Sequence, residues 1–152
     1  MFTPMMGPAI GRSYNRPADE ARRQFNAALQ RGNLFTALNG LLGRRQGLNS
    51  LPSFAEFRRE YSRGLVTVPI RKIIGSENRS RDYDRFFNPL NETTRERWIR
   101  VAVSIFKGRP LPPITLIEVD GFYYLRDGHH RVSVARMNGQ LEIEALVTVW
   151  ER

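Results

Sequence analysis

Five consecutive residues, Asp127-Gly128-His129-His130-Arg131, combine side chains that can bind or transform a phosphate group. A histidine can donate or exchange a proton near neutral pH, and arginine can fork onto phosphate oxygens. Glycine lets a backbone approach a ligand closely, and a carboxylate can orient a histidine or bind Mg²⁺. The stretch therefore predicts an anion site in which Gly128 to Arg131 bind phosphate and Asp127 and His129 are candidate catalytic residues.

A structural alternative is a polar turn in which the Asp127 carboxylate caps a following helix. The two histidines are the only ones in the chain, and their position at such a turn favours a functional role. They do not predict a zinc site, because neighbouring residues on a helix point about 100° apart, whereas good ligand pairs lie at i and i+4. We predict no metal site from the histidines.

The elements around this stretch would place it at the start of a helix. Two β-rich runs, "ITLIEV" and "FYYLR", are joined at Asp120-Gly121, which is a strong hairpin signal. A helix over about 130–138 follows, with Gly139 at its end, and "IEALVTVW" predicts a last strand. The first N–H groups of a helix have no partners within it, so the backbone itself would attract an anion.

Upstream of the hairpin, the chain predicts a strand, a polar loop and a helix. The strand is "LVTVPI", and the loop is "GSENRSRDYDRF", whose acids Asp82 and Asp84 are loop carboxylates or Mg²⁺ ligands. The helix lies in "NETTRERWIRVAVSIFKG", with Asn91 or Thr93 as its cap and Gly108 after its end. Loops of this kind often carry function.

The first 64 residues predict helices rather than strands. Residues 1–16 have no periodicity and predict a flexible leader. Apolar spacing predicts a helix from Pro17 that ends before Gly32, a second over Leu34 to Leu42, and a third that begins at Ser53. We therefore divide the chain into a leader, an Arg-rich helical extension over 17–64, and a domain over 65–152.

The composition favours a polyanionic partner. The net charge is +9, and residues 1–64 contribute ten arginines against four carboxylates. Such an excess favours contact with nucleic acid or nucleotide, and the extension is a candidate surface for DNA. The chain has no cysteine, no apolar run long enough for a membrane helix and no secretory signal. We therefore expect a cytoplasmic protein without membrane contact.

The order of elements from Val68 to Val149 resembles the ParB/sulfiredoxin superfamily. The resemblance rests on "VSIFKGRPLPPI" before the hairpin and "GHHRVSVARMNG" after it. It implies an α+β fold with a small mixed sheet and helices. The corresponding motif is Gly-Glu-Arg-Arg in ParB proteins, which bind nucleotide triphosphates, and Gly-Cys-His-Arg in sulfiredoxins. Gly128 and Arg131 match both, His130 matches the sulfiredoxin histidine, and His129 stands at the cysteine or glutamate position.

The resemblance implies nucleotide chemistry but not sulfiredoxin activity, which the absence of cysteine excludes. Free serine kinases of the same fold use a carboxylate from the loop after the first strand as a base. Glu77 is the candidate for that base here, and Arg79 and Arg81 beside it are candidate phosphate clamps.

We expect a ParB-like, DNA-associated protein that binds ATP, ADP or CTP, with Mg²⁺ as a candidate cofactor and a homodimer as a candidate assembly. One alternative is an Mg²⁺-dependent small-molecule kinase, or a nuclease with His129 or Glu77 as base. Another is a non-catalytic partner-binding module with a vestigial phosphate site.

Overall fold

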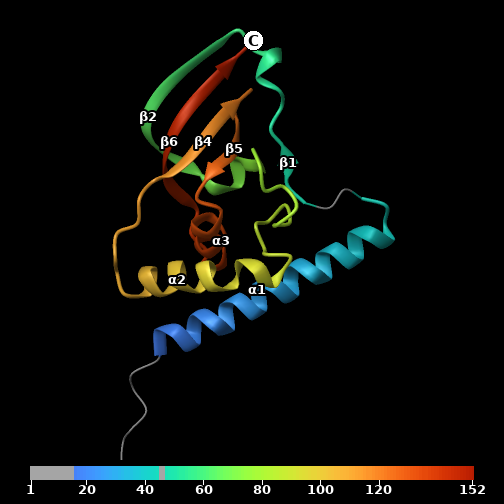
Figure 1. Ribbon diagram of the computed structural model, residues 1–152, viewed down its shortest axis with the longest axis vertical. Coiled ribbons are helices and arrows are strands. Elements are labelled where there is room, and N and C mark those ends of the chain that lie inside the picture. Colours follow the sequence, from blue (N-terminus) through green and yellow to red (C-terminus); the bar gives the residue numbers. More distant parts are fainter. Residues whose placement is uncertain (1–15, 45–46) are drawn as a thin grey trace, which may run out of the picture.

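The computed structural model describes residues 16–44 and 47–152, so the predicted flexible leader, apart from Arg16, lies outside the described residues. Within them the chain forms the predicted α+β fold, with a six-stranded mixed sheet, three α-helices and three short 3₁₀ helices (Figure 1). The elements are α1 (Arg16–Leu41), β1 (Asn49–Ser50), η1 (Phe54–Glu56), β2 (Arg59–Pro69), η2 (Ile70–Lys72), β3 (Ile73–Ser76), η3 (Glu92–Thr94), α2 (Arg95–Phe106), β4 (Ile114–Val119), β5 (Phe122–Asp127), α3 (His129–Met137) and β6 (Glu142–Glu151).

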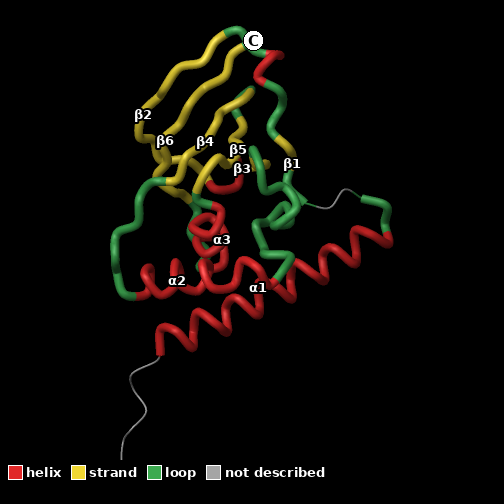
Figure 2. Tube along the Cα trace, viewed as in Figure 1, coloured by secondary structure: helices red, strands yellow, loops and turns green. Residues whose placement is uncertain are grey.

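The sheet and the three α-helices occupy different parts of the molecule, as Figure 2 shows with strands in yellow and helices in red. The strand order is β1-β3-β5-β4-β6-β2. The pairs β4–β5 and β2–β6 are antiparallel, whereas β1–β3, β3–β5 and β4–β6 are parallel. The predicted hairpin joins β4 to β5, with Asp120 and Gly121 at φ 52° and 81°. This hairpin delivers the chain to the start of α3.

Helix α3 lies between the two main groups of buried side chains. Its Val132 and Ala135 pack against the sheet together with residues such as Leu116. Its Val134 packs on the other side with Phe25 of α1 and Trp98 of α2, whose rings meet edge to face at 5.6 Å. Helix α3 is therefore held from both sides.

The predicted break in the first helix is wrong, because α1 continues through Gly32. A Cβ at Gly32 would lie 2.6 Å from the carbonyl oxygen of Pro89. Glycine is there so that α1 can approach the loop before α2, and not to end the helix. The separate helix predicted over Leu34 to Leu42 is the second half of the same element.

The helix predicted from Ser53 is also wrong. Ser53 caps only the short η1, and strand β2 begins at Arg59, so the division drawn between residues 64 and 65 falls inside a strand. The spacing of Phe54 and Phe57 looks helical, but both rings pack on Trp150, at 4.8 and 5.5 Å between centroids. They cover the face of the sheet opposite α3.

The other predicted elements are confirmed. The strand predicted over 65–70 is part of β2 except for Ile70, which begins η2, and the helices and the last strand appear as α2, α3 and β6. The Asn91 side chain accepts a hydrogen bond from the Thr93 N–H and so caps η3, directly before α2. Within the described part of the chain, no helix has the length and apolar character needed to cross a membrane.

Candidate functional site

The backbone at Gly128 has a conformation that suits glycine alone. Gly128 connects β5 to α3 with φ 107° and ψ 23°, in the left-handed region. A Cβ there would lie 2.5 Å from Cγ2 of Ile114 in β4. The turn therefore needs a residue without a side chain, and it sets the direction in which the first turn of α3 points.

The first turn of α3 offers backbone donors. The N–H of Val132 bonds to the Gly128 carbonyl at 3.0 Å. No backbone acceptor among the described residues pairs with the three preceding N–H groups, those of residues 129–131. Because such donors and the positive end of the helix dipole favour anions, the backbone here is suited to a phosphate group.

His129 is a buried, neutral residue tied to the end of β3. Its Nε2 lies 2.7 Å from Oγ of Ser76, which also accepts the N–H groups of Asn78 and Arg79 at 3.3 and 3.0 Å. With both lone pairs of Ser76 Oγ occupied, the hydroxyl donates its proton to Nε2. The proton of the neutral His129 ring is thereby assigned to Nδ1.

His130 is tied to a different partner, the buried phenol of Tyr83, with 2.8 Å between Oη and Nδ1. Burial raises the pKa of Tyr83 far above its usual value, so the phenol keeps its proton. Nδ1 of His130 is the one partner of this buried hydroxyl among the described residues, so we assign the phenol as the donor and Nδ1 as the acceptor. The proton of the neutral His130 ring then lies on Nε2. This Nε2–H is buried and has no acceptor among the described residues.

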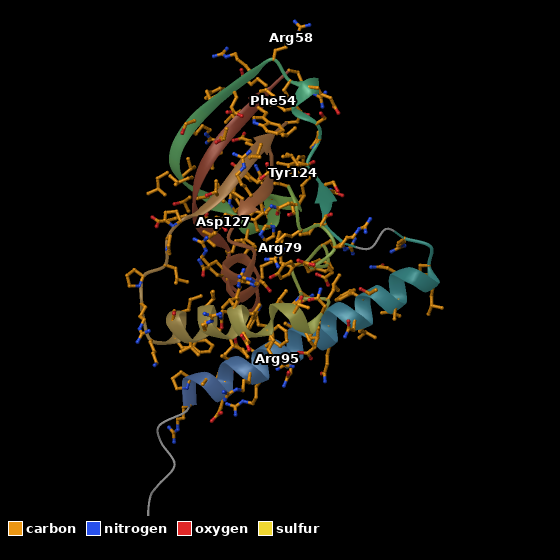
Figure 3. All side chains as sticks on the ribbon, viewed as in Figure 1. Phe54, Arg58, Arg79, Arg95, Tyr124 and Asp127 are labelled. Atoms are coloured by element: carbon orange, nitrogen blue, oxygen red, sulfur yellow. The ribbon has the colours of Figure 1, made fainter. Side chains whose placement is uncertain are left out.

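Arg79 supplies a positive charge beside the two rings. Burial, followed by the charge of Arg79, lowers the pKa of both His129 and His130 to about 4. The Arg79 guanidinium is about a third exposed and pairs with Asp82 at 2.8 Å. In Figure 3, Arg79 and Asp127 both lie near the start of α3. The site is therefore cationic through Arg79 and not through imidazolium groups.

Arg131 is committed to the protein rather than to a ligand. Its Nη1 donates to the carbonyls of Pro112 and, at 2.9 Å, Pro113, while its Nη2 pairs with Asp127 at 2.7 Å. Arg131 thus fastens the proline-rich segment before β4 to the first turn of α3. Asp127 is largely exposed and orients Arg131, and no hydrogen bond joins it to either histidine among the described residues.

Glu77, the predicted base, and Arg81, the second predicted phosphate clamp, have neighbours other than the two histidines. Glu77 follows β3 and forms a two-pronged ion pair with Arg126, at 2.9 and 3.2 Å. Arg81 is exposed and lines a separate pocket of about 480 Å³ with residues of β1, Ser80 and Tyr124. The structure brings Arg79 to the histidines, whereas Arg81 faces another pocket.

The carboxylates near the site are already engaged. Asp82 pairs with Arg79, and the buried Asp84 accepts three hydrogen bonds from its own loop, so both act as loop acids. Within residues 16–44 and 47–152, no group of three or more His, Cys, Asp or Glu side chains could hold a metal ion.

Sequence reasoning missed Ser76 and Tyr83, the two residues that fix the histidine tautomers. Both lie in a stretch that the sequence indicates only as a polar loop. Strand β3 is four residues long and pairs in parallel with β5, so it leaves no alternating pattern in the sequence. The apolar pair Ile73-Ile74 directly before Gly75 was the available signal for this strand.

Comparison with known proteins gives one limited likeness. The sequence matches no protein-family model and no curated protein. Among solved structures, it is similar to the crystal structure of sulfiredoxin from Arabidopsis thaliana, with 28% sequence identity and a TM-score of 0.39. The match covers 55% of this chain and 82% of the sulfiredoxin chain.

Proposed function

We propose that this chain is a ParB/sulfiredoxin-type protein that binds a nucleotide or another phosphate-bearing ligand at the start of α3. The observation that carries the proposal is the Nε2–H of His130, a buried donor with no acceptor among the described residues. Such a donor is costly to leave unpaired, and a phosphate oxygen is a suitable acceptor. It lies in the first turn of a helix beside the Arg79 cation.

Three kinds of donor would hold the phosphate. The backbone N–H groups of the first turn and the His130 Nε2–H donate hydrogen bonds, and Arg79 adds a charge-assisted contact. Arg131 is a positioning residue, because its bonds to the Pro112 carbonyl and to Asp127 hold the turn before α3 in place. The proposed ligand is thus bound by backbone N–H groups, the neutral imidazole of His130 and the guanidinium of Arg79.

The superfamily assignment is supported by the two motifs that carry the resemblance. The segment "GRPLPPI" and the helix "GHHRVSVA" are far apart in the sequence. In the structure Arg131 of the second motif donates to the Pro112 and Pro113 carbonyls of the first. Through this contact both motifs help to position the start of α3.

Phosphoryl transfer or nuclease activity is the alternative, and the geometry favours binding over it. Glu77 would have to leave Arg126 before it could act as a base. A neutral His129 whose Nε2 is occupied by Ser76 is also poorly placed to accept a proton there. A partner-binding module with a vestigial phosphate site remains the third hypothesis, and the absence of ligand binding would favour it.

DNA association through the arginine-rich segment is a further proposal. Several of its cations are already paired, as in Arg22–Asp19 at 3.1 Å and Arg23–Glu20 at 2.6 Å, which weakens the case. Retention on duplex DNA that falls steeply with salt would support it. Absence of retention at low salt would remove it. A homodimer stays a proposal, with sedimentation velocity as its test.

A thermal-shift screen tests the ligand proposal. The full chain is heated with inorganic phosphate, ATP, ADP or CTP, each with and without Mg²⁺. A ligand bound only by the folded state stabilises it by about 2.7 kcal/mol at a hundred times its Kd, so at least one compound should raise Tm in a saturating way. If none of them raises Tm at millimolar concentration, the proposed function is wrong.

A further inference from the structure

The second half of α1 carries a stripe of exposed apolar side chains. Figure 1 shows this half of the helix extending beyond the rest of the helical layer. Leu41 is 85% exposed, and Leu34 and Leu42 are more than 60% exposed, which is unusual for leucine on one helix face. The members of this apolar stripe are Leu34, Phe35, Leu38 and Leu41 of α1, and Leu42 directly after the end of the helix.

The stripe is distinct from the face that holds α1 to the protein. The buried face of α1 consists of Ala21, Phe25, Ala28 and Gly32. At 100° per residue, the five stripe residues fall within an arc of about 120° that lies beside this face rather than on it. A surface of that width on an exposed helix is typical of an interaction site.

One end of the stripe opens onto a pocket of about 260 Å³. Phe35 lies in this pocket and contacts Phe86 from the loop before α2, with 5.2 Å between ring centroids. The pocket also reaches α3, and its lining residues are Arg31, Phe35, Phe86, Asn88, Arg136 and Met137. A concave pocket at the end of an apolar stripe fits a helix that inserts one side chain and lays its apolar face along α1.

The exposed charges around this surface have one sign, and the carboxylate nearest to it, Asp84, is buried. No aspartate or glutamate occurs between residues 21 and 55, whereas Arg31 and Arg44 flank the two ends of the stripe. Arg85 and Arg136 lie over the Phe86 ring, at 4.7 and 5.9 Å. Burial lowers the pKa of Arg136, and among the described residues the one hydrogen bond of its side chain is to the Arg85 carbonyl at 3.4 Å. A carboxylate from a partner would pair this cation.

We propose that the apolar stripe and its pocket bind an amphipathic helix of another protein, with carboxylates along the flanks of its apolar face. A second copy of this chain fits less well. Antiparallel pairing of two stripes centred on Leu38 would bring Arg31 of one copy beside Arg44 of the other, and like charges at an interface are unfavourable. A membrane surface fits less well too, since it has no side chain for the pocket. The proposal is independent of the ligand site at α3.

A display library of helical segments tests this proposal on the full chain. Each segment has about 18 residues, with apolar residues at i, i+3, i+4 and i+7 and flanking positions randomised among Glu, Gln and Lys. Binding of the segments to the wild-type chain is compared with their binding to two variants. One is Leu38→Gln/Leu41→Gln, and the other is the control Leu65→Gln, whose leucine is exposed on β2. All three substituted side chains are exposed, so folding should be unaffected.

The expected result is enrichment of Glu at the flanks of the selected segments. Binding should weaken at least about tenfold in the double variant and stay unchanged in Leu65→Gln. No enrichment, enrichment of Lys, or equal binding by the double variant would overturn the proposal. Binding of wild type, but not the double variant, to vesicles of phosphatidylcholine and phosphatidylglycerol would assign the stripe to a membrane instead. Stripe-dependent dimers in sedimentation velocity would assign it to a second copy.

Discussion

At the scale of single residues, the two adjacent histidines have separate tasks. His129 is held by Ser76 at the end of β3, and His130 is held by Tyr83 from the following loop. The tautomers that follow place a proton on Nδ1 of His129 and on Nε2 of His130. Of these two protons, only the one on Nε2 of His130 is buried and without an acceptor among the described residues. A pair that looks equivalent in the sequence is therefore not equivalent in the fold.

The stability of the protein should depend on pH through these histidines. Both have a folded-state pKa of about 4, against about 6.5 when unfolded. Above pH 6.5 the rings are neutral in both states, whereas between pH 6.5 and 4 the unfolded state binds more protons. The free energy of unfolding should therefore fall as the pH is lowered from 6.5 to 5, measured by urea denaturation. The variant His129→Gln/His130→Gln should show a flatter dependence, and an equally steep one would contradict the assigned pKa values.

Gly128→Ala should destabilise the protein more than Gly139→Ala. Both glycines have a positive φ, so each substitution costs about 1–2 kcal/mol of backbone strain. Only at Gly128 does the new Cβ meet Ile114, which adds about 1–3 kcal/mol, whereas a Cβ at Gly139 meets nothing within 4 Å. Chemical denaturation of both variants measures the difference, and equal losses would show that Ile114 does not restrict this turn.

At the scale of elements, the sequence predicts those whose pattern is local. The hairpin follows from Asp120-Gly121, α2 follows from its apolar spacing, and the ends of α2 and α3 follow from Gly108 and Gly139. Strands β1 and β3 are too short to leave a periodic pattern, and both pair in parallel with segments far along the chain. Arg131 was correctly predicted to lie at the start of a helix, but its bonds to the Pro112 and Pro113 carbonyls were not predictable. These carbonyls belong to a segment that only the fold brings there.

Two glycines of α1 should respond in opposite directions to alanine. Gly32 approaches the Pro89 carbonyl so closely that a Cβ at 2.6 Å forces a shift, which should cost about 1–3 kcal/mol. Gly40 is exposed in the same helix, so Gly40→Ala should raise the free energy of unfolding by about 0.5–1 kcal/mol. Urea denaturation measures both. A stabilising Gly32→Ala would mean that α1 does not pack on the 88–90 loop.

At the scale of the whole molecule, one buried hydroxyl joins three elements. Ser133 of α3 accepts a hydrogen bond from Nε1 of Trp98 in α2, at 2.8 Å. It donates to the Phe87 carbonyl, in the loop between β3 and η3, at 2.6 Å. Since α3 also contributes to the sheet core, this contact couples the helical layer to the sheet and keeps the start of α3 in place.

Ser133→Ala should therefore lower the free energy of unfolding by about 2–4 kcal/mol, because it leaves a buried N–H and a buried carbonyl unpaired. Ser104→Ala is the matched control on α2. Ser104 is partly buried and has no side-chain hydrogen bond among the described residues. Ser104→Ala should therefore change the free energy of unfolding by no more than about 0.5 kcal/mol. A small effect at Ser133 would indicate that water or another group can replace the hydroxyl.

Calorimetric titration of ATP, ADP and CTP into wild type, Arg79→Gln and Arg81→Gln tests the ligand site most directly. The two arginines are close in one loop, but only Arg79 lies beside the histidines, and its ion pair with Asp82 is partly exposed. We predict that wild type and Arg81→Gln bind at least one nucleotide with similar affinity and that Arg79→Gln binds it about tenfold more weakly. Absence of nucleotide binding by wild type, or an equal loss in Arg81→Gln, would contradict a phosphate site at the start of α3.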